Sequence, residues 1–276
     1  MITAAKYLPK KGIIFPKKKL GQNFLTDANI VRKVIAAANL KPNDTVLEIG
    51  PGTGILTCEL AKTAKKVVAV EFDQDLIGAL KESLKDFGNV ILISGDIRRF
   101  DERKIESGYK IAANLPFYLT APIIRKFLES ENPPKELTLI VQKEVAQRII
   151  AKPPQMSLLA VSVQFYAKPK IVSYISKNCF WPSPKVDSAI LKITPKIQTS
   201  EKKLAEVFFK IAKAGFSHPR KQLINNLSNS FFSKDNREGG RKKIETWFKK
   251  CCLDPAQRAE TLTVGDWINL AKTNPL

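Results

Sequence analysis

The tetrapeptide Asn114-Leu115-Pro116-Phe117 places an amide, a rigid residue and an aromatic ring directly after an apolar run. Asn and Pro both favour chain reversals, so an ordinary turn is one interpretation of this segment. In the other interpretation, Asn114 hydrogen-bonds a flat, nitrogen-bearing ligand while Phe117 stacks on it. The tetrapeptide alone is compatible with both, and the choice depends on the residues around it.

Other residues with useful chemistry also follow apolar segments. The glycine-rich segment Gly50–Gly54 follows "TVLEI", Glu71 ends "KVVAVE", and Asp96 follows "NVILISG". Glu71 lies 21 residues beyond Gly50, where a carboxylate can accept from both hydroxyls of a ribose. Asp96 can accept from an adenine amino group. Each of these residues alone is common at a helix start, but their placement at successive strand ends predicts a site for an adenosine-containing molecule.

The glycine-rich segment does not fit NAD. The dinucleotide pattern G-x-G-x-x-G requires glycine at position 55, which is Ile55. The loop also lacks a basic residue for a pyrophosphate. Glu48, inside the preceding strand, suits a ligand that carries positive charge, such as a sulfonium with an amino group.

Segments with strand and helix patterns alternate around these residues. Apolar strands are expected at 45–49, 66–73, 89–96, 110–117 and 136–142, with helices at 27–40, 55–64, 74–87 and 122–130. Asp27 is the expected N-cap of the first helix. This alternation predicts a parallel sheet covered on both faces, with ligands beyond the carboxyl ends of its strands.

The pattern changes in the second half of the chain. The segments 158–167 and 188–194 are expected to be late strands, and helices are expected at 201–216, 219–232, 239–253 and 263–273. The predicted organisation is a basic arm (1–19), a nucleoside-binding α/β domain (20–198) and a helical domain (199–276).

The net charge of +20 is unevenly distributed. Residues 1–19 carry six lysines and no acid, whereas residues 20–136 carry 16 basic and 16 acidic side chains. Basic side chains are also in excess in the rest of the chain. Residues 137–200 carry 9 basic and 2 acidic side chains, and residues 201–276 carry 15 basic and 8 acidic ones. This pattern predicts that the basic segments on either side of the electrically neutral residues 20–136 bind a polyanion. Nucleic acid is favoured over an anionic membrane. The basic residues favoured as phosphate contacts are Lys17, Lys18, Lys19, Arg220 and Lys221.

Other classes of protein fit poorly. The four cysteines form no C-x-x-C pair and His218 is the only histidine, so neither a disulfide framework nor a metal site is expected. No apolar run approaches the ~18–20 residues that span a bilayer. The sequence therefore predicts a cytoplasmic protein with no membrane partner.

A series of motifs resembles one family. The motifs "LGQNFL" (Leu20–Leu25), "LEIGPGTGILT" (Leu47–Thr57), "VEFD", "GDI", "NLPF", "FWPSPKVDSA" (Phe180–Ala189) and "RAETLT" (Arg258–Thr263) follow one another along the chain. Together they resemble the small-subunit rRNA adenine N6-dimethyltransferases of the KsgA or RsmA type. The resemblance covers nearly the whole chain.

This resemblance implies the Rossmann-like α/β fold of S-adenosylmethionine-dependent methyltransferases. Its sheet has seven mostly parallel strands, the seventh antiparallel, and a small helical domain follows. It also implies a monomer that acts on small-subunit rRNA in the pre-30S subunit. The positions that match the family's S-adenosyl-L-methionine site are Asn23, Leu25, Gly50, Glu71, Asp96 and Asn114, to which the glycine turn adds Gly52.

The implied reaction is N6-dimethylation of two adjacent adenosines in a hairpin loop near the 3' end of 16S rRNA, coupled to ribosome assembly. The Asn114 side-chain oxygen and a backbone carbonyl near Leu115 are expected to accept from N6–H. Phe117 would stack on one face of the base, and Phe180 resembles the residue that covers the other. The family usually has Tyr where Phe117 stands, and this replacement removes a possible hydrogen bond but keeps the stacking face.

Two alternatives remain open from the sequence. One is a large-subunit adenine methyltransferase of the macrolide-resistance type, which shares the cofactor motifs. The segments "NLPFYLTAPII" and "RAETLTVGDW" favour the small-subunit type. The other is a ribosome-assembly factor that binds RNA without methyl transfer, against which the intact "NLPF" with Glu71 and Asp96 argues.

Overall fold

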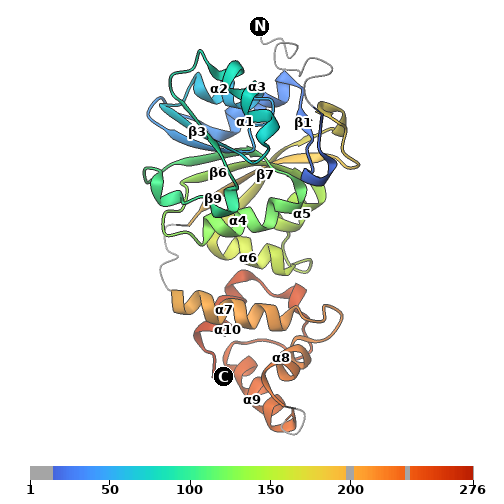
Figure 1. Cartoon of the computed structure of the whole chain (residues 1–276). Coiled ribbons are helices and arrows are strands. Elements are labelled where there is room, and N and C mark those ends of the chain that lie inside the picture. The colour runs from blue at the N-terminus through green and yellow to red at the C-terminus, as the bar shows by residue number, and fades with distance from the viewer. Residues whose placement is uncertain (1–14, 197–201, 234–236, 276) are drawn as a thin grey trace. The chain divides into compact units, whose positions relative to one another are not determined.

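The computed structural model describes residues 15–196, 202–233 and 237–275 (Figure 1). Positions 1–14 of the predicted basic arm (1–19) therefore lie outside the described residues. The chain forms two compact units. The first runs to Ala146 and resumes at Lys168–Pro195, and the second holds Gln147–Ala167 and the residues from Lys196 onward.

A seven-stranded sheet forms the centre of the first unit, in the order β4-β3-β2-β5-β6-β9-β7. Neighbouring strands from β4 to β6 pair in parallel, and β9 pairs antiparallel with β6. The predicted mostly parallel sheet with a late antiparallel strand is confirmed. The strands are β2 (Thr45–Ile49), β3 (Lys66–Glu71), β4 (Val90–Ser94), β5 (Lys110–Asn114), β6 (Glu136–Gln142), β7 (Ala167–Ile175) and β9 (Ser188–Pro195).

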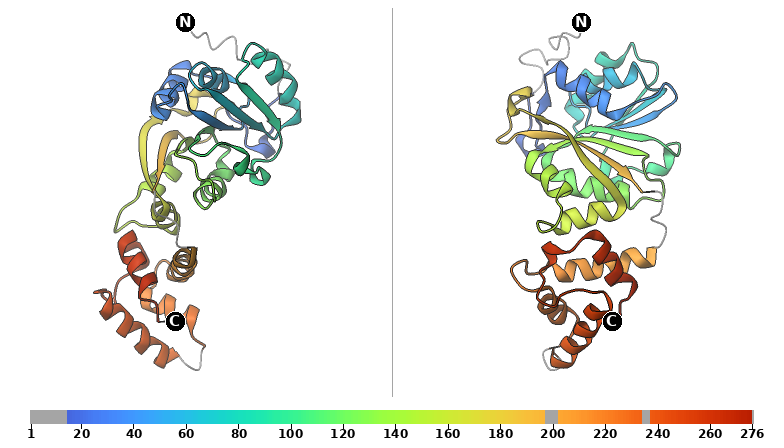
Figure 2. Two further views of the ribbon diagram at one scale, coloured as in Figure 1. Left: turned by 90° about the vertical axis from the view of Figure 1, so that its left-hand side faces the viewer. Right: turned by 180° about the vertical axis from the view of Figure 1, so that it is seen from behind.

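Helices cover both faces of this sheet, as the two further views in Figure 2 also show. One face carries α1 (Ala28–Ala38), α2 (Ile55–Ala61) and α3 (Gln74–Leu84), and the other carries α4 (Thr120–Leu128) (Figure 1). Asp27 caps α1, as predicted, because its carboxylate accepts from the backbone N–H groups of Asn29 and Ile30. The core between α1, α2 and the sheet includes Val31, Val34, Val46, Leu56, Val67 and Ile190.

A short ribbon that the sequence did not predict joins two distant motifs. Strand β1 (Phe24–Leu25) pairs antiparallel with β8 (Phe180–Trp181). Leu25 lies opposite Phe180, and Phe24 lies opposite Trp181. The ribbon therefore places the "LGQNFL" and "FWPSP" motifs side by side.

The strand expected at 158–167 is wrong, because Leu158–Tyr166 forms helix α6. Ser157 begins this helix, since its hydroxyl accepts from the backbone N–H of Ala160. A short run that is apolar on all sides fits a buried strand and a buried helix equally well, so its pattern could not decide. Strand β7, next in the chain, and helix α5 (Lys143–Ile150) were not predicted either.

The second unit is helical. Besides α6 it contains α7 (Lys202–Gly215), α8 (Leu223–Phe231), α9 (Arg237–Lys250) and α10 (Val264–Lys272), which confirms the four helices expected after residue 200. Trp247 and Trp267 are fully buried in it. The second unit also includes Gln147–Ala167, a segment that the sequence analysis assigned to the α/β domain ending at residue 198. Within the described ranges, no helix is both long and apolar enough to cross a membrane.

Candidate functional site

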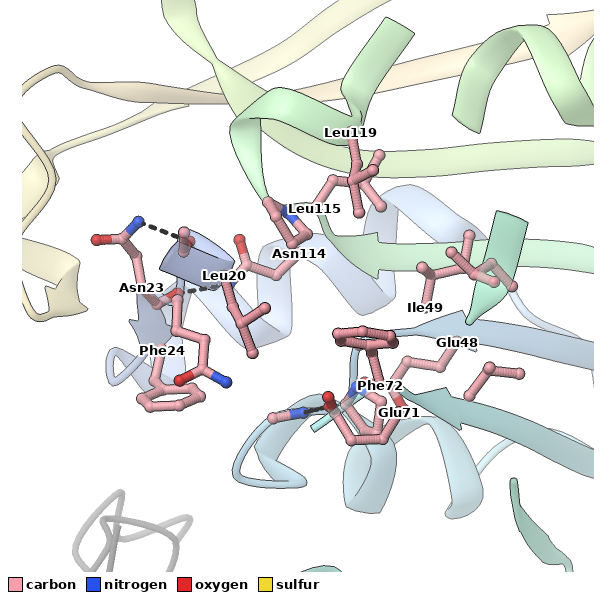
Figure 3. Close-up of a pocket in the computed structure, with 18 of the residues that line it drawn as sticks. Leu20, Asn23, Phe24, Glu48, Ile49, Glu71, Phe72, Asn114, Leu115 and Leu119 are labelled. Carbon is pink, nitrogen blue, oxygen red and sulfur yellow. Dashed lines mark hydrogen bonds between the residues drawn. The ribbon is translucent and has the colours of Figure 1, made fainter. Parts of the chain in front are cut away.

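One cavity of the first unit lies at the carboxyl ends of β2, β3 and β5 (Figure 3). Residues of the β1 segment and of β8 complete its wall. The structure thus brings together every residue that the sequence predicted for the cofactor and the base: Asn23, Leu25, Gly50, Gly52, Glu71, Asp96, Asn114, Leu115, Phe117 and Phe180.

The glycine turn after β2 has a backbone that other residues rarely adopt. Gly50, Gly52 and Gly54 have φ angles of 68°, 59° and 81°. At Gly52 a side chain would also crowd the Phe24 ring, since an added Cβ would lie 3.0 Å from its nearest carbon. The chain is therefore free to approach a ligand closely at this edge of the sheet.

Glu71 is a fixed, buried carboxylate at the end of β3. Its side chain is 6% exposed, its Oε1 accepts from the N–H of Asp73 at 2.8 Å, and its Oε2 accepts from the N–H of Gly52 at 3.1 Å. Burial raises the pKa of Glu71, while these two N–H groups oppose the shift. Each oxygen keeps a lone pair that can accept from a ligand hydroxyl.

Asp96 follows β4 and caps a short 3-10 turn, Ile97–Arg99. Its carboxylate accepts from the Arg98 backbone N–H at 2.9 Å and from the Arg98 guanidinium, with Nη2 2.7 Å from Oδ2. This guanidinium holds the pKa of Asp96 below its usual value. The capping interpretation is thus confirmed. The contact with an adenine amino group stays a prediction, and it requires Asp96 to accept hydrogen bonds from Arg98 and from the ligand at the same time.

Asn114 ends β5 with its amide in a fixed orientation. Its Nδ2 donates to the backbone oxygen of Asn23 at 2.8 Å, which leaves Oδ1 as the group that can accept from a ligand. The next residue is also held, because the Leu115 N–H donates to the Ile140 oxygen at 3.2 Å. In Figure 3, Asn114 and Asn23 lie close together, and Glu71 and Phe72 lie at the other side of the opening.

The aromatic side chains differ in exposure. Phe117, in the turn after Pro116, is half-buried, and Phe180 is 5% exposed. Phe72 also lines the cavity and is 54% exposed, although the sequence did not single it out. Its position directly after Glu71 was the available signal, because an exposed ring beside a ribose acceptor can contact the attached base.

The start of the described chain is tied to α3 beside the cavity. Lys17 Nζ lies 2.6 Å from Asp73 Oδ1 and 2.6 Å from Asp75 Oδ2. Gln22 Nε2 donates to the other Asp73 oxygen at 2.7 Å. Lys17 is therefore engaged within the protein, so a phosphate contact by it would compete with two carboxylates.

The other predicted phosphate contacts are not part of the cavity lining. Lys18 and Lys19 are exposed in the first unit, and Arg220 and Lys221 are exposed in the second. Their role stays a prediction. Among the described residues, no cluster of three or more His, Cys, Asp or Glu side chains could hold a metal ion.

Glu48, which the sequence suggested would suit a positively charged ligand, lines the cavity. It is 1% exposed, and its Oε2 has no hydrogen-bond partner among the described residues. Burial, with a smaller contribution from the charge of Glu71, raises the pKa of Glu48 to about 8, while the Thr57 hydroxyl opposes the shift. An unpaired buried acceptor facing a cavity fits a ligand with a donor or a positive charge.

The stability of the ligand-free protein should fall between pH 5 and pH 8 because of Glu48. Below the pKa of an ordinary carboxyl group, Glu48 is protonated in both the folded and the unfolded protein. Above that pKa the unfolded chain loses this proton, whereas the folded protein keeps it until about pH 8, so rising pH favours unfolding. The loss is at most about 1.4 kcal/mol per pH unit, about 2–4 kcal/mol in total. Urea unfolding of the wild type and Glu48→Gln at several pH values measures it.

The variant should lose less stability over this range because its amide does not titrate. Glu82→Gln is the matched control, since the Glu82 side chain is 75% exposed, and it should follow the wild type. Parallel curves for the wild type and Glu48→Gln would contradict the assignment.

Comparison with known proteins gives consistent sequence matches. A family model described as ribosomal RNA adenine dimethylase matches residues 16–273. A protein of Dehalococcoides mccartyi, strain BAV1, named ribosomal RNA small subunit methyltransferase A, is 41% identical over 274 residues, covering 98% of this chain and 92% of its own. The protein of that name from Moorella thermoacetica is 39% identical over 281 residues, covering 96% and 94%.

Solved structures share the fold. A dimethyladenosine transferase from Plasmodium falciparum superposes with a TM-score of 0.76 at 26% identity, covering 90% of this chain and 95% of the other. The 23S rRNA methyltransferase ErmE superposes with a TM-score of 0.73 at 23% identity, covering 91% and 99%. These likenesses confirm the Rossmann-like methyltransferase fold expected from the sequence.

Proposed function

The chain belongs to the ribosomal RNA adenine dimethylase family, and from this membership we propose that it dimethylates N6 of two adjacent adenosines in small-subunit rRNA. S-adenosylmethionine is the methyl donor. The observation that carries the proposal is the cavity itself, which combines a buried carboxylate at the end of β3 with an oriented amide and the rings of Phe117 and Phe180.

The residues present fit S-adenosylmethionine. Glu71 has lone pairs left for two ribose hydroxyls, and the glycine turn allows close approach of the backbone. The unpaired Glu48 Oε2 gives the floor of the cavity an acceptor suited to a cationic ligand. When bound, this cofactor would supply a methyl group activated by the positive sulfonium.

The chain's own residues prepare the adenine nitrogen. N6 is a poor nucleophile because its lone pair is delocalised into the ring. Acceptance from N6–H by Asn114 Oδ1 and by the Leu115 carbonyl would draw the nitrogen toward tetrahedral geometry and free that pair. Pro116 keeps both acceptors in place. Phe117 and Phe180 would stack on the base, which must leave any helical stack to enter.

The substrate follows from the relatives. Proteins named ribosomal RNA small subunit methyltransferase A share 38–42% identity with nearly the whole chain. The structural likeness to ErmE, at 23% identity, bears on the fold alone. We propose that the enzyme acts as a monomer on small-subunit rRNA of the pre-30S particle in the cytoplasm. The phosphate contacts proposed for it are Lys18, Lys19, Arg220 and Lys221.

A methylation assay with separated ribosomal subunits tests this function. The protein is incubated with S-adenosylmethionine labelled with tritium in the methyl group and with small or large subunits whose 16S or 23S rRNA is unmodified. Transfer to 16S rRNA is expected, with N6,N6-dimethyladenosine after nuclease digestion. Transfer to 23S rRNA alone would contradict the substrate, and RNA binding without any transfer would establish an assembly factor.

A further inference from the structure

Strand β7 carries lysines and apolar side chains on one exposed face. Exposed and less exposed residues alternate along it, and the exposed set is Lys168, Lys170, Val172 and Tyr174. Val172 is 45% exposed and Tyr174 is 51% exposed. Side chains two residues apart lie on the same face of a strand, so the four form one stripe about 20 Å long.

The chain beyond β7 leads from this stripe to the cavity. Lys177 and Lys185 are exposed on the connection to β9, which also contains β8. Phe180, between these two lysines, lines the cavity, and the adjacent Trp181 is 43% exposed. A strand of nucleic acid whose base enters the cavity can therefore continue along β7.

The charge of this region is positive and unneutralised. Residues 168–186 contain four lysines and no acid. In the part of the chain that the structure describes, none of these four ammonium groups makes an ion pair. A fifth ammonium, Lys143 Nζ, lies 5.5 Å from the centre of the Tyr174 ring. Unpaired lysines interleaved with exposed rings are typical of surfaces that bind single-stranded nucleic acid.

Protection of a sheet edge explains only part of this pattern. β7 is the edge strand of the sheet, and lysines and prolines on such strands prevent pairing with other sheets. Lys168, Pro169 and Lys170 fit that role. Exposed Val172 and Tyr174 do not, because apolar side chains on an edge promote association, and Lys177 and Lys185 lie outside the strand.

We propose that Lys168, Lys170, Val172, Tyr174, Lys177 and Lys185 form a track that binds the rRNA strand adjoining the target adenosine. The lysines contact its phosphates, and Tyr174 stacks on a base. That the RNA is ribosomal rests on the proposed function. The track itself is a property of the first unit and predicts binding to any single strand of RNA.

The test compares two quadruple variants of the full chain. In the track variant Lys168, Lys170, Lys177 and Lys185 are each replaced by Gln. The control variant replaces four exposed lysines of the balanced segment by Gln, with the same change in net charge: Lys41, Lys81, Lys104 and Lys135. Binding of a fluorescein-labelled single-stranded RNA 20-mer and of a 16S rRNA transcript is measured across a salt series.

The track variant should bind both RNAs at least about tenfold more weakly at 0.1 M salt. Its slope of log affinity against log salt should fall by about 2–3, since each phosphate contact on a single strand contributes about 0.7. The control should stay within about threefold of wild type. Tyr174→Leu keeps an apolar side chain and should weaken binding about three- to tenfold with an unchanged slope.

Equal losses in the two quadruple variants would overturn the track, because net charge alone would then explain them. Unchanged RNA binding in the track variant, with loss of binding to phosphatidylglycerol vesicles, would also overturn it and assign the surface to a membrane. Affinity for S-adenosylhomocysteine should be unchanged throughout. Failure of the proposed function would appear separately, as wild-type protein that binds the 20-mer through the track but methylates neither rRNA.

Discussion

Replacing Asn114 with alanine should lower the single-turnover rate of methyl transfer by about 10²–10³-fold, the range found when one oriented group that stabilises a transition state is removed. The amide contacts N6 most strongly as that nitrogen rehybridises, so its loss should appear in the rate more than in binding. Affinities for S-adenosylhomocysteine and 16S rRNA should stay within a few fold. Rapid-quench kinetics with saturating enzyme measures the effect.

Asn114 has a structural contact as well as a free acceptor, so the rate effect needs a control. Because Asn114 Nδ2 donates to Asn23, the alanine variant loses both the free Oδ1 and a bond to the β1 segment. Asn132→Ala is a matched control, since its amide donates to the oxygens of Glu102 and Ile105 away from the cavity. It should lower the melting temperature but keep the rate. A rate near wild type for Asn114→Ala would show that the amide is only a turn residue.

The sequence predicted the cavity well because its residues follow local patterns. Strands β2 and β6 were predicted to the residue, since both are short, mostly apolar segments. The fold rule that ligands bind at the carboxyl ends of parallel strands then brought Gly50, Glu71 and Asn114 together. Asn23 and Phe180 had no such pattern, and only the family resemblance assigned them.

Features that depend on distant pairing could not be predicted. The β1–β8 ribbon consists of two residues on each side, which is too short to leave a periodic pattern. Lys17 looked like one member of a basic run, and its two ion pairs depend on where α3 begins. In β7 the lysines and Pro169 concealed the strand, although the alternation of exposed and less exposed residues along it is what identifies the track.

Glu71→Ala should weaken the binding of S-adenosylhomocysteine by about 10–100-fold. A charge-assisted hydrogen bond contributes about 1.5–3 kcal/mol, and about 1.4 kcal/mol corresponds to tenfold in affinity. The carboxylate is already oriented by the N–H groups of Asp73 and Gly52, so a ribose would gain its contacts without reordering the side chain. Isothermal titration calorimetry measures the change directly.

The variant also leaves two backbone donors without their acceptor, so loss of stability must be separated from loss of ribose contact. Glu71→Gln keeps the size of the side chain and one acceptor oxygen, and its affinity should lie between those of the wild type and Glu71→Ala. Glu102→Ala removes a carboxylate that accepts from Ser130 and pairs with Lys126 outside this cavity. It should destabilise the fold while binding S-adenosylhomocysteine as the wild type does. If folded Glu71→Ala also bound with wild-type affinity, the acceptor at the end of β3 would not hold the ribose, and Glu71 would serve only to tie the glycine turn to the start of α3.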